Sequence, residues 1–475
     1  MRYFHFPVHD IDPVDVFASF EQEPYALLFD SSDPDHPLSH CSYICAFPVE
    51  KIESVDEKVT ITNKDRQFVV HDNPFDVLKQ RLEHWAPDEN AFSQINGVHR
   101  FVGGAAGYFG YDLGRTLEQL PVRAKRQNTI PDMAMGIYTS VMAFNHGSGK
   151  AILYILAKSE SDAEAQAGKI FKKLRERQSG ANDNVTSADL MPEKKAEEFK
   201  SDIRKVIDYI YAGDIFQANL SMQFAAKRPE GFNSFAHYQK LRSLNKAPFS
   251  AFLNYNDFQI ASVSPESFLS CHKGDVITRP IKGTCPRESD EAANKQAIAA
   301  LQADEKCRAE NAMIVDLLRN DLSRVCTDFS IDVPSLCEIE SYARVNHMVS
   351  TIKGELRPDH HVIDLVKACF PGGSITGAPK IRAMEIIEEL EPVRRGPYCG
   401  AIGFIGFDQS LETNIAIRTI VHQQDTITMN VGGGIVTDSN PESEYAEIMA
   451  KAKGLLQSFE ISDFDEDEQR EEKRA

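Results

Sequence analysis

Two kinds of hydrophobic pattern follow one another along the chain. Before residue 180, short apolar runs alternate with turns rich in Gly and Pro. The runs are YALLF (25–29), YICAF (43–47), VTIT (59–62) and AILYIL (151–156). Runs of this length and composition are typical of antiparallel strands more than of repeated βαβ units. The first part of the chain is therefore predicted to be rich in β-sheet.

The pattern becomes helical after residue 195. Apolar residues recur at helical spacing over 199–210, and Gly213 supplies a stop signal. Further helices are predicted near 292–319, 361–369, 379–390 and 442–457, and strands over 249–255, 258–263, 401–407, 413–420 and 426–436. Interleaved helices and strands of this kind predict an α+β fold.

Two polar segments suggest boundaries. Residues 179–195 mix Gly, Asn, Ser and Pro as linkers do, and the charged run 461–475 has little to bury. We therefore expect a β-rich region over 1–185, a second region over 195–460 and a disordered acidic tail over 461–475.

Charge and cysteine content narrow the function classes. The formal net charge of -19 argues against a nucleic-acid-binding surface, which needs clustered Lys and Arg. No apolar run approaches the ~20 residues of a membrane span, and the first residues lack the pattern of a signal peptide. The nine cysteines form no C-x-x-C pair, so they are interpreted as reduced thiols. We expect a cytoplasmic protein without a membrane anchor.

Carboxylates on two predicted helices are candidate magnesium ligands. On the helix that follows Asn440, Glu444, Glu447 and Lys451 share one face, and a second helix carries Glu310. Mg²⁺ prefers hard oxygen ligands and is usually held by one or two carboxylates. The alternative is a solvated helix face with an ordinary Glu447–Lys451 pair.

Two glycine-rich segments and one lysine also stand out. The loop 370–380 opens a helix as a phosphate-binding loop does, but its Lys380 comes too late for that motif. Residues 432–434 are all Gly within a predicted strand, which indicates close approach of the backbone to a ligand or to another chain segment. Lys282 lies in an apolar run and is either a buried nucleophile or a lysine that reaches water.

Together these segments resemble the chorismate-utilising enzymes, a family that includes anthranilate, aminodeoxychorismate, isochorismate and salicylate synthases. The motifs occur in family order: DIFQANLS, SPESF, RPIKGT, ENAMIVDLLRND, FPGGSITGAPKIRAMEIIEELE, GAIGF, IAIRT, and GGGIVTDS with PESEYAE. The resemblance implies a two-layer antiparallel β-sandwich core flanked by helices, with the active site between the sheets. It also implies that 1–185 is an N-terminal subdomain like that of anthranilate synthase component I, and that 195–460 is the chorismate-binding catalytic domain.

The resemblance also assigns roles to individual residues. Glu310 and Glu447 match the ligands of Mg²⁺, with Glu444 as a water-mediated contact. Glu266 matches the acid that helps the 4-hydroxyl of chorismate to leave, and His347 matches a histidine beside C2. The positions that match substrate-binding groups are Arg418, Tyr398, Gly283, Thr284, Gly434 and Lys451. One departure is Ser267, which stands where many relatives have Arg.

Two positions distinguish the subfamilies. Gln217 resembles the members that use ammonia, because the members that use water have Lys there. Lys282 resembles aminodeoxychorismate synthases, because anthranilate synthases have Ala at this place. The resemblance then implies a covalent Lys282 adduct at C2, followed by attack of ammonia at C4. The ammonia is expected from a glutamine amidotransferase partner in a heterodimer, since no glutaminase motif is found. The alternatives are an anthranilate synthase large subunit and a chorismate-binding regulator without activity.

Overall fold

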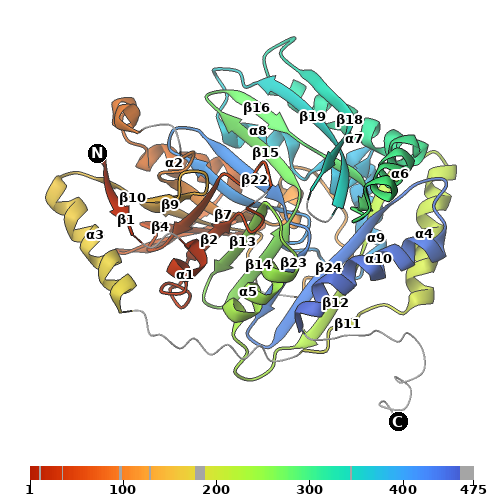
Figure 1. Ribbon diagram of the computed structural model, residues 1–475, viewed down its shortest axis with the longest axis horizontal. Coiled ribbons are helices and arrows are strands. Elements are labelled where there is room, and N and C mark those ends of the chain that lie inside the picture. Colours follow the sequence, from red (N-terminus) through yellow and green to blue (C-terminus); the bar gives the residue numbers. More distant parts are fainter. Residues whose placement is uncertain are drawn as a thin grey trace.

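The computed structural model describes residues 1–9, 12–34, 36–95, 99–127, 130–176, 188–342 and 345–459. Within these ranges the chain forms two 12-stranded antiparallel sheets with helices packed around them (Figure 1). The predicted α+β fold with a two-layer antiparallel core is confirmed.

The first sheet begins with N-terminal strands and ends with strands near the predicted catalytic residues. Its order is β1 (Arg2–Val8), β10 (Lys150–Ala157), β9 (Ser140–Asn145), β3 (Cys41–Cys45), β2 (Ala26–Asp30), β13 (Phe249–Asn254), β14 (Phe258–Ser264), β23 (Thr419–Gln423), β24 (Thr426–Ile435), β12 (Gln217–Lys227) and β11 (Met191–Pro192). The short strand β20 (Gly377–Ala378) also pairs with β12.

The second sheet likewise combines strands from the N-terminal region with strands from the later part of the chain. Its order is β17 (Ile281–Pro286), β19 (Val345–Glu355), β16 (Asp275–Thr278), β15 (Ser267–His272), β22 (Leu411–Ile415), β21 (Ala401–Gly406), β7 (Gly104–Phe109), β8 (Met133–Tyr138), β4 (Glu50–Val55), β5 (Lys58–Asn63) and β6 (Gln67–His71). Strand β18 (Asp332–Ser341) also pairs with β19.

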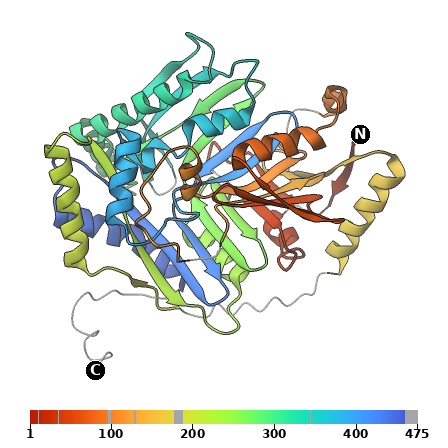
Figure 2. The same ribbon diagram turned by 180° about the vertical axis from the view of Figure 1, so that it is seen from behind.

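Helices cover both sheets and share their apolar cores. One core joins the first sheet to α1 (Pro13–Phe17), α3 (Glu160–Arg175), α4 (Ala196–Tyr211), α5 (Ser234–Leu244), α9 (Lys380–Leu390) and α10 (Pro441–Leu456). The other core joins strands of both sheets to α2 (Pro74–Trp85), α7 (Glu305–Ser323) and α8 (Val362–Cys369). From behind, the orange helix α2 crosses the second sheet (Figure 2). The remaining elements are α6 (Glu291–Ala303), η1 (Glu89–Gln94), η2 (Tyr111–Thr116), η3 (Gly373–Ile375) and η4 (Gln457–Phe459).

Two predicted helix ends are confirmed by their capping residues. Helix α4 ends at Tyr211, and Gly213 takes a left-handed φ of 81° just beyond it. Helix α10 begins after Asn440, whose side chain accepts hydrogen bonds from the backbone N–H groups of Glu442 and Ser443.

Two element predictions are wrong in their boundaries. The helix predicted over 292–319 is two helices, α6 and α7, because Asp304 ends the first and caps the second by accepting the N–H of Cys307. The strand predicted over 413–420 is two strands in different sheets, β22 and β23. The chain turns between them at Arg418, whose φ is 50°.

The sheets continue across the predicted boundary between the two regions. Strand β2 pairs with β13, and β7 pairs with β21, so residues from both regions share each sheet. The division into 1–185 and 195–460 stays a prediction. The first part of the linker (179–187) and the predicted tail (461–475) lie outside the described residues.

The prediction of reduced thiols is confirmed, since none of the nine cysteines forms a disulfide, and five of them are buried. Among the described residues, no helix is long and apolar enough to cross a membrane.

Candidate active site

Gln217 begins β12 and is completely buried. Neither its Nε2 nor its Oε1 has a hydrogen-bond partner among the described residues. A Cβ atom on Gly434 of the neighbouring strand β24 would overlap Gln217 Nε2 and would lie 3.7 Å from Glu310 Oε2. A buried amide with no partner is costly, so Gln217 is a candidate for binding a group that is not among the described residues.

Two glycines of the triplet, Gly432 and Gly434, face β12 closely. A Cβ on Gly432 would lie 2.8 Å from the backbone oxygen of Leu220 and 3.0 Å from Asn219 Oδ1. The predicted close approach of the backbone is confirmed at this strand, and the chain segment it approaches is β12. Because the Gln217 side chain lies over Gly434, the glycine also gives that amide its place beside Glu310.

Glu266 connects the two sheets, since it lies between β14 of the first and β15 of the second. Its side chain is buried and accepts hydrogen bonds from the Ser374 hydroxyl and the Ile281 N–H. Burial raises the pKa of Glu266, against the lowering effects of nearby Lys282 and of those hydrogen bonds. A carboxyl group that keeps its proton to higher pH is suited to act as a general acid.

Lys282 lies on β17 and is half-buried. Its Nζ donates a hydrogen bond of 3.2 Å to the backbone oxygen of Ser374. Its positive charge lowers the pKa of the carboxyl groups of Glu266, Glu310 and Glu447. The amine is therefore neither in an apolar pocket nor free in water, but at the centre of the predicted catalytic residues.

The sequence interpretation missed the part played by Ser374. This residue lies in η3, inside the loop 370–380, and contacts both Glu266 and Lys282. The loop itself had been singled out by its glycines, which was the available signal. Its contacts here are with side chains of the site.

His347 and Thr284 lie on the neighbouring strands β19 and β17, with 2.7 Å between Thr284 Oγ1 and His347 Nδ1. Burial and then the charge of Arg418 lower the pKa of His347 to about 4, so its imidazole is neutral near pH 7. Gly283 precedes Thr284 at a φ of 89°, where β17 shifts its register against β19. The positive φ favours glycine at this position, and a Cβ there would also make a tight contact of 3.0 Å with Leu301 Cδ1.

Three carboxylates gather beside these strands. Burial raises the pKa of Glu310, the amines of Lys282 and Lys306 lower it, and Glu444 and Glu447 raise it again. Glu444 is buried and accepts hydrogen bonds from Ser439 Oγ at 2.6 Å and Lys306 Nζ at 3.0 Å. Lys306 was not predicted, although its spacing of four residues from Glu310 on one helix was a signal.

Glu447 and Lys451 form the ordinary pair of one helix face. Their charged atoms are 2.8 Å apart, and Lys451 also donates to the backbone oxygen of Gly432 at 3.2 Å. Burial raises the pKa of Glu447, but the amines of Lys451, Lys306 and Lys282 together outweigh it, and the net shift is downward. Glu447 is therefore ionised near neutral pH and can serve as an oxygen ligand.

A magnesium ion fits this donor set, although the residues do not form a dense cage. Among the described residues, no group of three or more His, Cys, Asp and Glu side chains is arranged for a metal. Mg²⁺ needs only one or two carboxylates and keeps waters. The mutual repulsion of Glu310, Glu444 and Glu447, and the unpartnered amide of Gln217 beside Glu310, are features that a hydrated cation would relieve.

Arg418 and Tyr398 lie in turns, outside the helices and strands. Arg418 joins β22 to β23 in a left-handed conformation that is uncommon for a non-glycine residue. Arg418 is exposed to solvent at its surface, burial of its guanidinium by the surrounding protein lowers the pKa of this group, and its positive charge lowers the pKa of His347. Tyr398 is buried, and the adjacent Cys399 interacts electrostatically with Glu266. The predicted residues therefore converge from both sheets.

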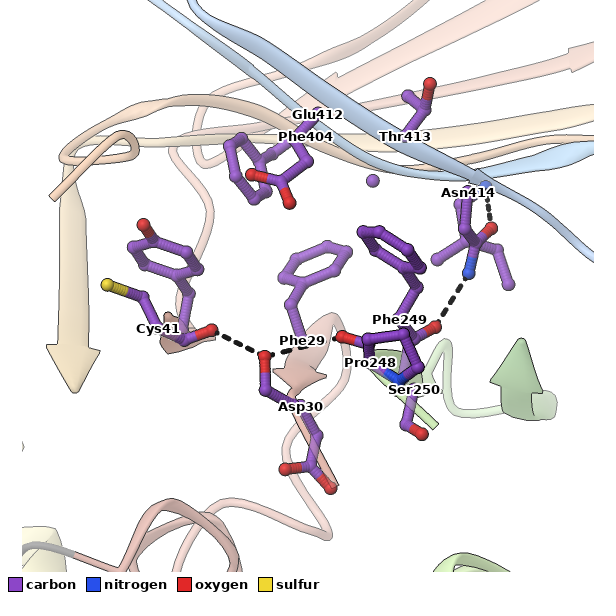
Figure 3. A pocket seen from close by; sticks show the side chains of 15 residues that line it. Phe29, Asp30, Cys41, Pro248, Phe249, Ser250, Phe404, Glu412, Thr413 and Asn414 are labelled. Atoms are coloured by element: carbon purple, nitrogen blue, oxygen red, sulfur yellow. Dashed lines mark hydrogen bonds between the residues drawn. The ribbon is translucent and has the colours of Figure 1, made fainter. Parts of the chain in front are cut away.

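A cavity lies between the sheets, apart from these residues (Figure 3). It is lined by aromatic rings, including Phe29, Phe249 and Phe404, and by the carboxyl group of Glu412, whereas the carboxyl group of Asp30 points away from the rings and binds Tyr238 and Arg242. No Lys or Arg stands among its described lining residues, so it offers no counter-charge to an anionic substrate. None of the predicted site residues lines this cavity.

Comparison with known proteins agrees with the geometry. The sequence profile of the family described as chorismate binding enzyme matches residues 25–457. The chain is 39% identical over 450 residues to aminodeoxychorismate synthase component 1 of Salmonella typhimurium, covering 94% of this chain and 95% of that protein. It is 37% identical to the Escherichia coli protein of the same name, with coverage of 94% and 95%. A crystal structure of anthranilate synthase component I from Streptococcus pneumoniae superposes with a TM-score of 0.78 at 32% identity, covering 89% of this chain and 93% of that one.

Proposed function

Because the chain belongs to the chorismate-binding enzymes, we propose that it is the large subunit of an aminodeoxychorismate synthase, which replaces the 4-hydroxyl of chorismate with an amino group. The observation that carries this proposal is the position of Lys282, whose amine donates to Ser374 O and faces Glu266. The names of the similar Salmonella and Escherichia proteins point the same way.

Lys282 is the proposed nucleophile of the first step. Its nitrogen attacks C2 of chorismate, the ring double bonds shift, and the C4–O bond breaks. The proton of Glu266 leaves with the hydroxyl as water. The buried Glu266 carboxyl, with its raised pKa, supports the role of proton donor.

Ammonia then completes the reaction. It attacks C4, the double bonds shift back, and the bond between C2 and Lys282 breaks, which frees the amine. The proton that the new ammonium group loses restores the carboxyl group of Glu266. The net change is chorismate and ammonia to aminodeoxychorismate and water. Gln217, whose buried amide has no partner among the described residues, is the proposed contact for a small polar reactant.

The substrate is a dianion, and its two carboxylates need positive charge or hydrogen-bond donors. Arg418 and Tyr398 are proposed to hold one carboxylate, and Gly283, Thr284 and Gly434 to line the other. Lys451 is proposed as a further substrate contact. Neutral His347, which shares a hydrogen bond with Thr284, would lie beside C2.

Magnesium is the proposed cofactor. Glu310 and Glu447 would hold it directly and Glu444 through a water. When bound, the ion would offset negative charge on the substrate and withdraw electrons through the ring carboxylate. Several carboxylates lie around Lys282 and Lys306. Without a bound cation, their negative charge would repel the dianionic substrate, which supports the proposal.

We further propose that ammonia comes from a glutamine amidotransferase partner and that the product feeds 4-aminobenzoate and folate synthesis in the cytoplasm. The word "component" in the names of the relatives supports a partner.

Anthranilate synthase is the second candidate, because a crystal structure of that enzyme superposes well. The two activities differ in product, and a single assay separates them. Purified protein is incubated with chorismate, ammonium and magnesium, and the products are separated by chromatography. Aminodeoxychorismate without fluorescent anthranilate is expected, whereas anthranilate as the main product would overturn the proposal.

A further inference from the structure

A buried ion pair between Glu391 and Arg395 lies next to the candidate site. Arg395 Nε donates to Glu391 Oε2 at 2.8 Å, and Arg395 Nη2 donates to Glu391 Oε1 at 2.7 Å. Both side chains are buried. Neither was singled out by the sequence, and the proposed chemistry does not use them.

The pair completes one edge of β12. On this edge β12 pairs with β20 at Gln217 and Ala218 and with β11 at Phe224 and Ala225. Between these points Glu391 Oε1 accepts from Ser221 N at 2.8 Å and from Ser221 Oγ at 2.9 Å, and Arg395 Nη2 donates to Asn219 O at 2.6 Å. Side chains therefore satisfy backbone groups that a neighbouring strand would otherwise bind.

The same guanidinium reaches the loop that carries Ser374. Arg395 Nη1 donates to the backbone oxygen of Ile375 at 2.9 Å, and Ile375 directly follows Ser374. The guanidinium also stacks near Tyr111 and Tyr398, 4.7 and 5.9 Å from the ring centres. One side chain thus touches β12, the loop and a predicted substrate-binding residue.

We propose that the Glu391–Arg395 pair is a positioning device for the catalytic groups, which sets Gln217 through β12 and sets Lys282 and Glu266 through Ser374. This inference rests on the proposed chorismate chemistry. Ser374 contributes its backbone oxygen to Lys282 and its hydroxyl to Glu266, so a shift of the loop moves both groups at once. The planar fork of arginine is needed, because a lysine cannot reach Glu391, Asn219 and Ile375 together in the same geometry.

The test compares Arg395→Lys and Glu391→Gln with Glu50→Gln. Glu50 is an equally buried carboxylate that accepts two hydrogen bonds from Arg81, and it lies on β4 away from the site. The rate of chorismate consumption is measured at saturating ammonium, together with melting temperature. Consumption is defined whichever product forms, so a wrong assignment of product does not obscure the result.

We expect both site variants to lose on the order of 100-fold in kcat, because small misplacements of reacting groups have effects of this size. The KM for chorismate should change less than kcat, because Tyr398, the proposed carboxylate contact beside the pair, meets the guanidinium only through a ring centre 5.9 Å away. Glu50→Gln should lower the melting temperature and leave kcat near the parent value. A kcat loss in the site variants no larger than in Glu50→Gln would overturn the inference.

A second measurement tests the route through Ser374. In Ser374→Ala, Glu266 loses a hydrogen bond that lowers its pKa, so the fall of activity on the basic side should move to higher pH. Arg395→Lys should move this fall in the same direction. The variant that carries both Ser374→Ala and Arg395→Lys should lose less activity than the product of the two single losses. If the two losses of activity simply multiply in the double variant, the pair does not act through Ser374. The same conclusion follows if the pH at which activity falls on the basic side does not move in Arg395→Lys.

Discussion

The amine of Lys282 and the carboxyl group of Glu266 are both bonded to Ser374, one to its backbone oxygen at 3.2 Å and the other to its hydroxyl. The proposed nucleophile and the proposed proton donor are thereby held on one small residue of the loop 370–380. The proposed first step needs both of them on the same ring, at C2 and at the C4 oxygen. The shared contact gives a physical reason for that coordination.

Removal of a carboxylate should abolish magnesium-dependent turnover without unfolding the protein. Glu310→Gln and Glu447→Gln each take a charged oxygen from a hard cation while keeping side-chain size. Turnover is measured against magnesium concentration, and melting temperature is measured in parallel. A parent-like magnesium dependence in both variants would contradict the proposed metal ligands.

Gly434→Ala should strongly impair catalysis, because the new Cβ would overlap Gln217 Nε2 and displace the amide beside Glu310. Gly168→Ala is the matched control, since Gly168 lies in α3 and a Cβ there meets nothing within 4 Å. The control should be stabilised by about 0.5–1 kcal/mol through helix propensity, with unchanged turnover. Equal turnover of the two variants would show that the place of Gln217 over Gly434 is unimportant.

Acid should destabilise the fold through a buried histidine pair. His237 Nδ1 lies 3.0 Å from His422 Nε2, and His237 Nε2 lies 2.9 Å from Ser458 Oγ. The Ser458 hydroxyl donates to Leu455 O, so His237 donates to Ser458 and accepts from His422, with both rings neutral. Burial lowers the pKa of His237 to about 3 and that of His422 well below its usual value.

The folded pKa of His237 lies below the unfolded value of ~6.5, so its contribution to stability is complete above that value and is lost as pH falls toward 3. At pH 5 the loss from this residue alone is on the order of 2 kcal/mol. Urea unfolding at pH 7.5 and pH 5 measures it. His237→Gln should weaken this pH dependence and the exposed control His71→Gln should not. An unchanged dependence in His237→Gln would refute the assignment.

The sequence predicted the residues of the site better than the contacts that hold them. Glu310, Glu447 and Lys282 have recognisable chemistry or motif context, and the structure brings them together. The contacts of Ser374 with Lys282, of Lys306 with Glu444 and of Glu391 with Ser221 became visible only in three dimensions, because the two partners in each contact lie far apart along the chain. Local patterns do not encode such pairings.

The errors in element boundaries have the same origin. The run 413–420 is continuously favourable for a strand, yet it is divided at Arg418 because the chain passes from one sheet to the other there. Helix periodicity likewise continued through Asp304, whose carboxylate caps the next helix and breaks the run. Tertiary context decided both cases.

The central claim is that Lys282 forms a covalent bond with the substrate. With chorismate and magnesium but neither ammonia nor glutamine, the adduct should accumulate, because the nucleophile that releases it is missing. Intact-mass spectrometry and peptide mapping should find the mass of chorismate less one water on the peptide that holds Lys282, and Lys282→Ala should show no such gain. An unmodified parent under these conditions, together with a Lys282→Ala variant that aminates C4 at the parent rate, would contradict the account.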